Sequence, residues 1–326
     1  MSNTPKIELH VHLEGTISPH LAVKIAARNK IKLDPHLFSA DGKSYPSDNF
    51  LDFLKTFDDL SAIIRQPIDY YDMVYDYLRA CALASTLYVE MMYSPLHAEK
   101  MTGIPSKEHV AAISDAIRRA EADFGIMARI IVTGVRHFGV ESCEMVATQA
   151  IKNASAYVTG FGLGGDEINF PAPLFQKTYQ IAKEEGLGLT IHAGEFGSAE
   201  SILAAIASCQ VSRIGHGVNA IKSERVIQSL IDKNIHLEIC PSSNLHFSLF
   251  DNMHAHPIRS LYQRGVSISI NSDDPPFFNT SIGQEYQKVE ALLGFSEDDF
   301  RKINTMAIQH AFLDQANKAK LLARLA

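Results

Sequence analysis

The sequence has few of the features that mark membrane, secreted or disulfide-stabilised proteins. Its four cysteines lie far apart and show no Cys-x-x-Cys spacing, so we expect reduced thiols rather than disulfides or a cysteine-based metal site. The apolar runs are too short to span a bilayer. The first of them begins at Ile7, which leaves no room for a signal peptide before it. These absences favour a cytoplasmic protein with no membrane partner.

Positive charge is also scarce. The chain has 30 Lys and Arg against 37 Asp and Glu, for a net charge of -7, and no basic run that would indicate nucleic-acid binding. No glycine-rich nucleotide loop of the Walker or dinucleotide type is present, so we expect no organic cofactor. What the sequence does have is 326 residues, 46% of them hydrophobic, which is enough to bury a large core.

Eight short, apolar, β-branched runs alternate with amphipathic helical stretches, a pattern typical of a parallel α/β fold. The runs are Lys6 to Leu13, Leu87 to Tyr93, Arg129 to Val135, Val158 to Leu163, Leu187 to Ala193, Arg213 to Gly217, His236 to Cys240 and Ser267 to Asn271. Eight strands in a chain of this length favour a (β/α)8 TIM barrel over an open sheet. A helical insertion after the first strand, roughly Thr16 to Ala84, is well placed to roof an active site. No repeat or linker divides the chain, so we predict a single domain over residues 1–326.

Polar side chains follow several of these runs at the point where each predicted strand ends. His10 and His12 close the first strand and share one face of it, because side chains alternate along a strand. His192, His216 and Asp273 close the fifth, sixth and eighth strands. A lone histidine in such a place is more often a hydrogen-bonded structural residue. In a barrel, however, these ends meet at one face, and converging imidazoles and a carboxylate suit Zn²⁺.

The motifs that contain these residues occur in a specific order. They are His10-Val11-His12-Leu13-Glu14-Gly15, Gly164-Gly165-Asp166-Glu167, His192-Ala193-Gly194-Glu195, Gly215-His216-Gly217, Ser243-Asn244 and Ser272-Asp273-Asp274-Pro275. Each motif is weak alone, but the ordered set resembles the adenosine deaminase family of the amidohydrolase superfamily nearly end to end. The resemblance implies a (β/α)8 barrel, one catalytic zinc ion per subunit, and hydrolytic removal of the exocyclic amine from a small-molecule 6-aminopurine.

The resemblance also implies a role for each matching residue. His10, His12, His192 and Asp273 correspond to the zinc ligands of the family. Zinc can lower the pKa of bound water from about 16 to about 7, which supplies hydroxide at neutral pH. His216 and Asp273 would hold that hydroxide and direct it at purine C6.

Three further residues would contact the purine. Glu195 resembles the acid that protonates ring N1, and a buried setting that raises its pKa would keep it protonated. The backbone N–H of Gly165 would meet N3, since glycine permits close approach of the chain to a ligand. Asp274 would pair with N7 and carry a proton itself, although an aspartate before proline is also a common turn opener.

The chain departs from the pattern of adenosine-specific relatives at one position that bears on substrate choice. Adenosine-specific relatives usually have aspartate at the position of Glu14, where it hydrogen-bonds a ribose hydroxyl, and here the side chain is one methylene longer. His-x-Glu-Gly openings resemble those of adenine deaminases and aminodeoxyfutalosine deaminases. Phe53 and Phe57, in the insertion, could cover the purine or the sugar. The leading hypothesis is deamination of adenosine and 2′-deoxyadenosine to the inosine product, with adenine or aminodeoxyfutalosine as the alternative substrate.

Other chemistries fit the sequence less well. A binuclear amidohydrolase typically bridges two metals with a lysine at the end of the fourth strand, which here ends Leu163-Gly164-Gly165. A zinc site of the cytidine-deaminase type needs Pro-Cys-x-x-Cys downstream of His-x-Glu, and that motif is absent. A non-catalytic purine-binding protein built on the same scaffold would have lost a metal ligand or the acid, and all of them are present.

Overall fold

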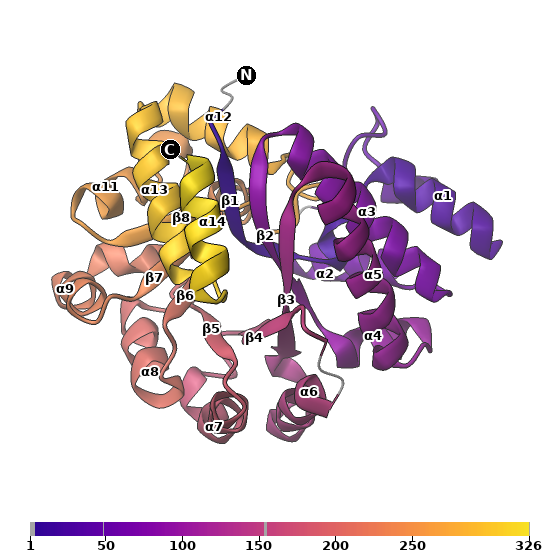
Figure 1. The fold of residues 1–326 in the computed structure, drawn as a ribbon, viewed down its shortest axis with the longest axis horizontal. Coiled ribbons are helices and arrows are strands. Elements are labelled where there is room, and N and C mark those ends of the chain that lie inside the picture. Colours follow the sequence, from indigo (N-terminus) through magenta and orange to yellow (C-terminus); the bar gives the residue numbers. More distant parts are fainter. Residues whose placement is uncertain (1–3, 48, 153–154, 326) are drawn as a thin grey trace.

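The computed structural model describes residues 4–47, 49–152 and 155–325. Its centre is one parallel sheet in which each strand pairs with the next in sequence, from β1 to β8, with helices around it (Figure 1). The strands are β1 Lys6–His12, β2 Thr86–Tyr93, β3 Met127–Val135, β4 Val158–Gly164, β5 Gly188–Ala193, β6 Arg213–His216, β7 His236–Ile239 and β8 Ser267–Ile270. All eight predicted runs form strands, so apolar run length and spacing were sufficient to locate them.

The sheet closes on itself at the carboxyl ends of β1 and β8. The His12 N–H donates to the Asp273 carbonyl at 2.9 Å, and the Asp273 N–H donates to the His10 carbonyl at 3.2 Å. Deeper in the barrel, the Leu9 N–H donates to the side-chain oxygen of Asn271 at 2.8 Å. The sheet is therefore a nearly closed (β/α)8 TIM barrel, which confirms the predicted fold class. The seam between the first and last strands lies beside the two β1 histidines.

The predicted helical insertion between β1 and β2 is also present. It contains α1 Pro19–Asn29, α2 Phe50–Ser61 and α3 Pro67–Leu83, with 3-10 turns η1 Glu14–Thr16 and η2 Pro35–Leu37. Local capping explains where two of these helices begin: the Ser18 side chain accepts from the Leu21 N–H, and Asn49 accepts from the backbone at the start of α2. Helix α2 presents Phe53 and Phe57 to the cavity described below.

The remaining helices lie between successive strands or, for the last three, after β8, and they complete the outer layer (Figure 1). They are α4 Pro95–Thr102, α5 Ser106–Phe124, α6 Val140–Lys152, α7 Gln176–Glu184, α8 Ala199–Cys209, α9 Glu224–Asp232, α10 Pro241–His246, α11 Ile258–Gln263, α12 Ile282–Leu293, α13 Glu297–His310 and α14 Gln315–Leu325, with η3 Arg136–Phe138, η4 Ala172–Phe175, η5 Val218–Lys222 and η6 Met253–Ala255. A separate small core joins Ile7 and Leu9 of β1 to α13 and α14. Across the described ranges, none of these helices combines the length and apolar character needed to cross a membrane.

Candidate active site

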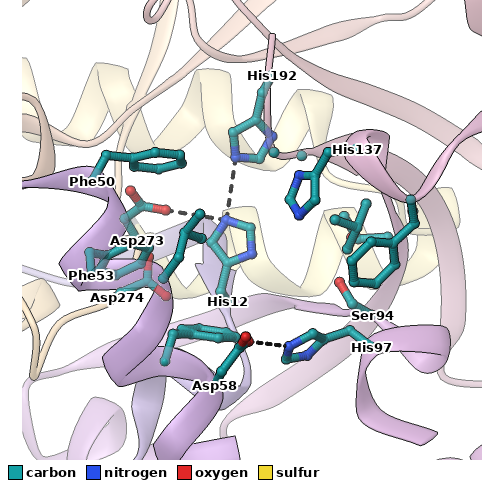
Figure 2. A pocket seen from close by; sticks show the side chains of 18 of the residues that line it. His12, Phe50, Phe53, Asp58, Ser94, His97, His137, His192, Asp273 and Asp274 are labelled. Carbon is teal, nitrogen blue, oxygen red and sulfur yellow. Dashed lines mark hydrogen bonds and ion pairs between the residues drawn. The ribbon is translucent and has the colours of Figure 1, made fainter. Parts of the chain in front are cut away.

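The four residues with predicted metal-ligand roles converge at the carboxyl-terminal mouth of the barrel. Potential donor atoms of His10, His12, His192 and Asp273 all lie within 4.8 Å of one another. The His12 Nε2 atom is 3.3 Å from His192 Nε2 and 3.4 Å from Asp273 Oδ1. Figure 2 shows these three side chains pointing toward one another, with His12 on β1, His192 on β5 and Asp273 beyond the end of β8. The barrel thus brings together residues that are up to about 260 positions apart in sequence.

These donor atoms have the chemistry that a divalent cation requires. Within the described residues, His10 Nε2 and Asp273 Oδ1 are buried without a hydrogen-bond partner, and they lie 3.4 Å apart. Unpaired buried polar atoms are costly, and a shared cation would satisfy both. Burial lowers the pKa of His12 to about 4, so its imidazole is neutral at pH 7. Burial lowers the pKa of His192 in the same way, whereas Asp273 and Glu238 raise the pKa of His10 to about 10, so a cation bound at His10 would displace a proton. Three imidazoles with a carboxylate form a donor set that fits zinc.

Asp273 remains ionised although it is buried. Burial by itself would raise the pKa of this carboxyl, but the neighbouring His10, whose own pKa is raised to about 10, outweighs it and holds the pKa of Asp273 below its ordinary value. The potential donor atoms of a second group, His10, His216, Cys240 and Asp273, also lie within 4.8 Å of one another. The Cys240 thiol is a poor ligand in comparison, because burial raises its pKa well above the ordinary value and only the thiolate binds metal strongly.

Two hydrogen bonds fix the orientation of the ligand imidazoles. His10 Nδ1 is 2.8 Å from Glu238 Oε2, and His192 Nδ1 is 3.0 Å from the Leu163 carbonyl oxygen. Both acceptors require a hydrogen on Nδ1, so Nε2 is the nitrogen of each ring that is available to bind a cation. Metal-binding histidines commonly have such partners.

Glu238 is itself part of a buried ion chain that the sequence analysis missed. Arg213 lies between two carboxylates, with its Nε 2.6 Å from Glu238 Oε1 and its Nη1 2.6 Å from Glu90 Oε2. All three side chains are 0% exposed. Buried charges are tolerated when paired in this way. The available signal was a charged residue within an otherwise apolar strand, as in the His236-Leu237-Glu238-Ile239 run of β7.

The loop that carries Glu195 is held by one carboxylate. Glu167 accepts hydrogen bonds from three backbone N–H groups, those of Gly194 at 2.5 Å, Glu195 at 3.2 Å and Gly197 at 3.1 Å. Asn219 adds side-chain donations to the Glu195 and Gly197 carbonyl oxygens at 2.8 and 2.7 Å. Glu167 therefore has a structural role, as expected for this part of its motif, whereas the sequence analysis did not identify Asn219.

Two acidic side chains at the site are held in their neutral form. Burial, followed by the charges of Asp273 and Glu167, raises the pKa of Glu195 well above its ordinary value. Burial and the charge of Asp273 raise the pKa of Asp274 in the same direction. Each carboxyl therefore carries a proton near neutral pH and can donate it or share it in a hydrogen bond. Glu195 Oε2 lies 3.6 Å from His216 Nε2.

Two residues of the site have backbone conformations that are unfavourable for residues other than glycine. His216 has φ 59° and Asp273 has φ 63°, both in the left-handed region. Non-glycine residues there typically cost about 1–3 kcal/mol, and such residues cluster at functional sites. Glycine is needed nearby for a different reason: a Cβ at Gly15 would lie 1.9 Å from Asp274 Oδ1.

The cluster opens into a cavity of about 200 Å³. Of the residues with predicted roles, those that line it are His12, Phe53, Phe57, Gly165, His192, Glu195, His216, Asp273 and Asp274. Phe53 and Phe57 of α2 form its roof with Phe50 and Phe247. The outer wall, with Ser94, His97 and His137, was not predicted to contact a ligand (Figure 2). His97 is held by Asp58 at 2.8 Å.

Glu14 occupies a different position from the other predicted substrate contacts. It is buried, and its Oε1 accepts a hydrogen bond from the Tyr70 hydroxyl at 2.9 Å. In the described part of the chain, the residues that line the cavity do not include it. Burial raises the pKa of Glu14 above its ordinary value. The longer carboxylate is therefore engaged with α3 of the insertion instead of forming part of the cavity wall.

Gly215 provides a test of the metal cluster, because the absence of a side chain at this position leaves room for the His10 ring. A Cβ at this position would lie 2.8 Å from His10 Cε1 and 3.3 Å from the His192 backbone. We expect Gly215→Ala to displace the His10 ring and weaken metal binding about 10- to 100-fold, as measured by competition with a chromogenic chelator. Gly283→Ala is the control, since its Cβ would make only ordinary contacts, with Ala84 Cβ at 3.4 Å and Ser281 Oγ at 3.9 Å. Unchanged metal affinity in Gly215→Ala would contradict the proposed ligand role of His10.

Comparison with known proteins agrees with this geometry. The sequence model of a family described as adenosine deaminase matches residues 5–326. The chain belongs to the adenosine deaminase family. It is 39% identical over 324 residues to a protein from Rhizobium rhizogenes named adenine deaminase, with 99% of each chain covered. The enzymes of this family are hydrolytic deaminases that act on a purine amine, and the resemblance found in the motifs is confirmed.

Solved structures of the family have the same barrel. An adenine deaminase from Arthrobacter aurescens has a TM-score of 0.91 at 28% identity, covering 99% of this chain and 98% of its own. An amidohydrolase from Burkholderia ambifaria with bound Zn has the same TM-score at 26% identity, covering 99% and 90%. Deaminases of this superfamily are metal-dependent, in agreement with the donor cluster of this chain.

Proposed function

We propose that this enzyme is an adenine deaminase that converts adenine and water to hypoxanthine and ammonia. The sequence analysis placed adenosine first and adenine second, and the comparisons favour the second hypothesis, since relatives at 37 to 40% identity carry the name adenine deaminase. The observation on this chain that supports the proposal best is the position of Glu14. Its carboxyl accepts a hydrogen bond from Tyr70, and Glu14 is not among the described residues that line the cavity. It is therefore not placed to meet a ribose hydroxyl.

The proposed metal is zinc, held by His10, His12, His192 and Asp273 at the mouth of the barrel. When bound there, a zinc ion would lower the pKa of water to about 7 and so supply a nucleophile at neutral pH. The protein contributes orientation, because the Glu238 and Leu163 contacts keep the ligand imidazoles from rotating.

The other side chains would act on the purine ring and on the attacking water. His216 and Asp273 orient the water toward C6 from one side. Glu195, protonated because of its burial, transfers its proton to N1, which withdraws electron density from C6 and makes addition favourable. Asp274 shares its proton with N7, and the Gly165 N–H faces N3. One proton of the water passes to the amine, the C6–N bond breaks, and the amine leaves as ammonia. The other proton of the water restores Glu195, and the added oxygen remains as the C6 carbonyl.

Ammonia release from four substrates tests the assignment. We expect kcat/KM for adenine to exceed that for adenosine, 2′-deoxyadenosine and an aminodeoxyfutalosine-type nucleoside by about 10²-fold, a discrimination that a closed pocket can readily provide. Glu14→Asp is a matched variant, because it shortens the side chain at the one position where adenosine-specific relatives differ. A wild-type preference for adenosine would contradict the proposal and restore the first hypothesis.

A further inference from the structure

A chain of hydrogen bonds leads from His216 away from the cavity into the protein. His216 Nδ1 is 3.2 Å from Asn244 Nδ2, and Asn244 Oδ1 is 3.1 Å from His256 Nε2. His256 Nδ1 accepts the backbone N–H of Ile258 at 3.2 Å. The four residues are buried. Asn244 belongs to the Ser243-Asn244 motif, to which neither the sequence analysis nor the proposed mechanism gives a role.

The donor and the acceptor of each hydrogen bond in this chain can be assigned from its last member, the backbone N–H of Ile258. A backbone N–H can only donate, so His256 Nδ1 is an acceptor and carries no hydrogen. Burial lowers the pKa of His256 to about 3, which keeps the ring neutral and places its one N–H on Nε2. That group donates to Asn244 Oδ1, so the Asn244 amide is held with its NH₂ toward His216. The amide orientation rests on a backbone group and is not an arbitrary choice between oxygen and nitrogen.

The same logic decides the state of His216. The Asn244 NH₂ group donates to His216 Nδ1, so Nδ1 must present a lone pair. A hydrogen at Nδ1 would set two donors against each other, which excludes both the other neutral tautomer and the doubly protonated ring. The single N–H of His216 is therefore on Nε2. Nε2 faces side-chain oxygens of Glu195 at 3.6 Å and Asp273 at 3.8 Å.

We propose that Asn244 and His256 are positioning residues that lock His216 as a neutral imidazole with its hydrogen on Nε2. In this state His216 is a hydrogen-bond donor toward the cavity and has no lone pair there. It can hold the oxygen of the attacking water, but it cannot remove a proton from it. The statement about the water rests on the proposed function, whereas the tautomer itself does not.

The tautomer can be read directly in the metal-loaded enzyme. Long-range ¹H–¹⁵N correlation spectra of protein labelled at histidine distinguish protonated from unprotonated ring nitrogens, and the His216 signals are identified by their loss in His216→Gln. We expect an unprotonated Nδ1 and a protonated Nε2. A protonated Nδ1, in either the neutral or the charged ring, overturns the proposal. Because this measurement needs no substrate, inactivity toward adenine would reject the proposed function and leave the lock to be decided by the spectra.

Asn244→Asp tests the proposal because it replaces the hydrogen-bond donor that faces His216 Nδ1 with an acceptor. A carboxylate of nearly the same shape has no donor, so His216 must place its hydrogen on Nδ1 to keep the contact. We expect the His216 spectral pattern to reverse and kcat for adenine to fall about 10- to 100-fold, the usual effect of losing an orienting partner, with KM nearly unchanged. An unchanged spectral pattern, or full kcat with a reversed pattern, contradicts the proposal.

A second pair of variants keeps the test independent of how well Asn244→Asp folds. His256→Gln retains both a donor and an acceptor, and we expect it to keep most of the wild-type kcat. His256→Met has no donor, which leaves the Asn244 amide free to turn, so kcat should fall and both His216 tautomers should be visible. His254→Met is the matched control, since His254 is an exposed histidine in the same loop. Equal behaviour of the Gln and Met variants at position 256 would overturn the lock.

Discussion

Replacing Glu195 with glutamine is expected to lower kcat for adenine by about 10²- to 10⁴-fold, the usual contribution of a positioned general acid. The amide has the shape of the carboxyl and can still donate a hydrogen bond, but it cannot transfer a proton to N1. The backbone of this loop is held by Glu167 and Asn219, so the substitution should leave the surroundings in place. Steady-state kinetics and metal analysis on the same samples are the measurements.

The pH profile gives the prediction a second readout. The pKa of Glu195 is raised well above its ordinary value by burial, so the protonated, active form persists through neutral pH and is lost as pH rises through that raised pKa. The wild-type kcat/KM should therefore have a basic limb that is absent in Glu195→Gln. Glu200→Gln, an exposed position in α8, is the control. Full turnover in Glu195→Gln with metal bound would mean that another group supplies the proton.

Removing the metal is expected to lower activity on the order of 10³-fold or more, since a metal ion supplies several kcal/mol of transition-state stabilisation. Dialysis against a strong chelator should give a folded, inactive enzyme, because three of the four proposed ligands lie on strands that the sheet hydrogen bonds already hold. Adding back Zn²⁺ should restore activity and raise Tm, because a ligand that binds only the folded state stabilises it.

His192→Ala extends this test to a single ligand. The variant should not regain activity with Zn²⁺ at concentrations that restore the wild type. The appropriate readouts are bound zinc per chain, ammonia release and circular dichroism. Full activity of the metal-free wild type, with zinc shown to be absent, would reject metal-dependent catalysis for this chain.

The barrel and the metal cluster could be predicted because both depend on local sequence. Each strand is an apolar run bounded by turn residues, so its position follows from composition. His10 and His192 lie near the carboxyl ends of two of these runs and Asp273 follows a third, and a barrel necessarily brings such positions to one mouth. Their convergence in the structure agrees with that reasoning.

The supporting contacts could not be predicted, because they join strands and loops that are distant in sequence. Glu238 is paired with His10 across 228 residues, and no local pattern indicates which histidine a buried carboxylate will hold. The position of Glu14 depends on Tyr70, which lies 56 residues later in α3. For the same reason, the choice between adenine and adenosine could not be decided from the His-x-Glu-Gly motif alone.

The contact between β1 and the segment after β8, which closes the barrel, determines when the metal site can form during synthesis and folding. The backbone of Asp273 forms the hydrogen bonds that close the sheet against His10 and His12, and its side chain belongs to the donor cluster with both of them. A growing polypeptide therefore has the two β1 histidines from the outset but lacks the complete set of ligands until residue 273 has left the ribosome. Acquisition of the metal would coincide with closure of the barrel, so that an incompletely synthesised chain has no assembled site with which to act on a purine.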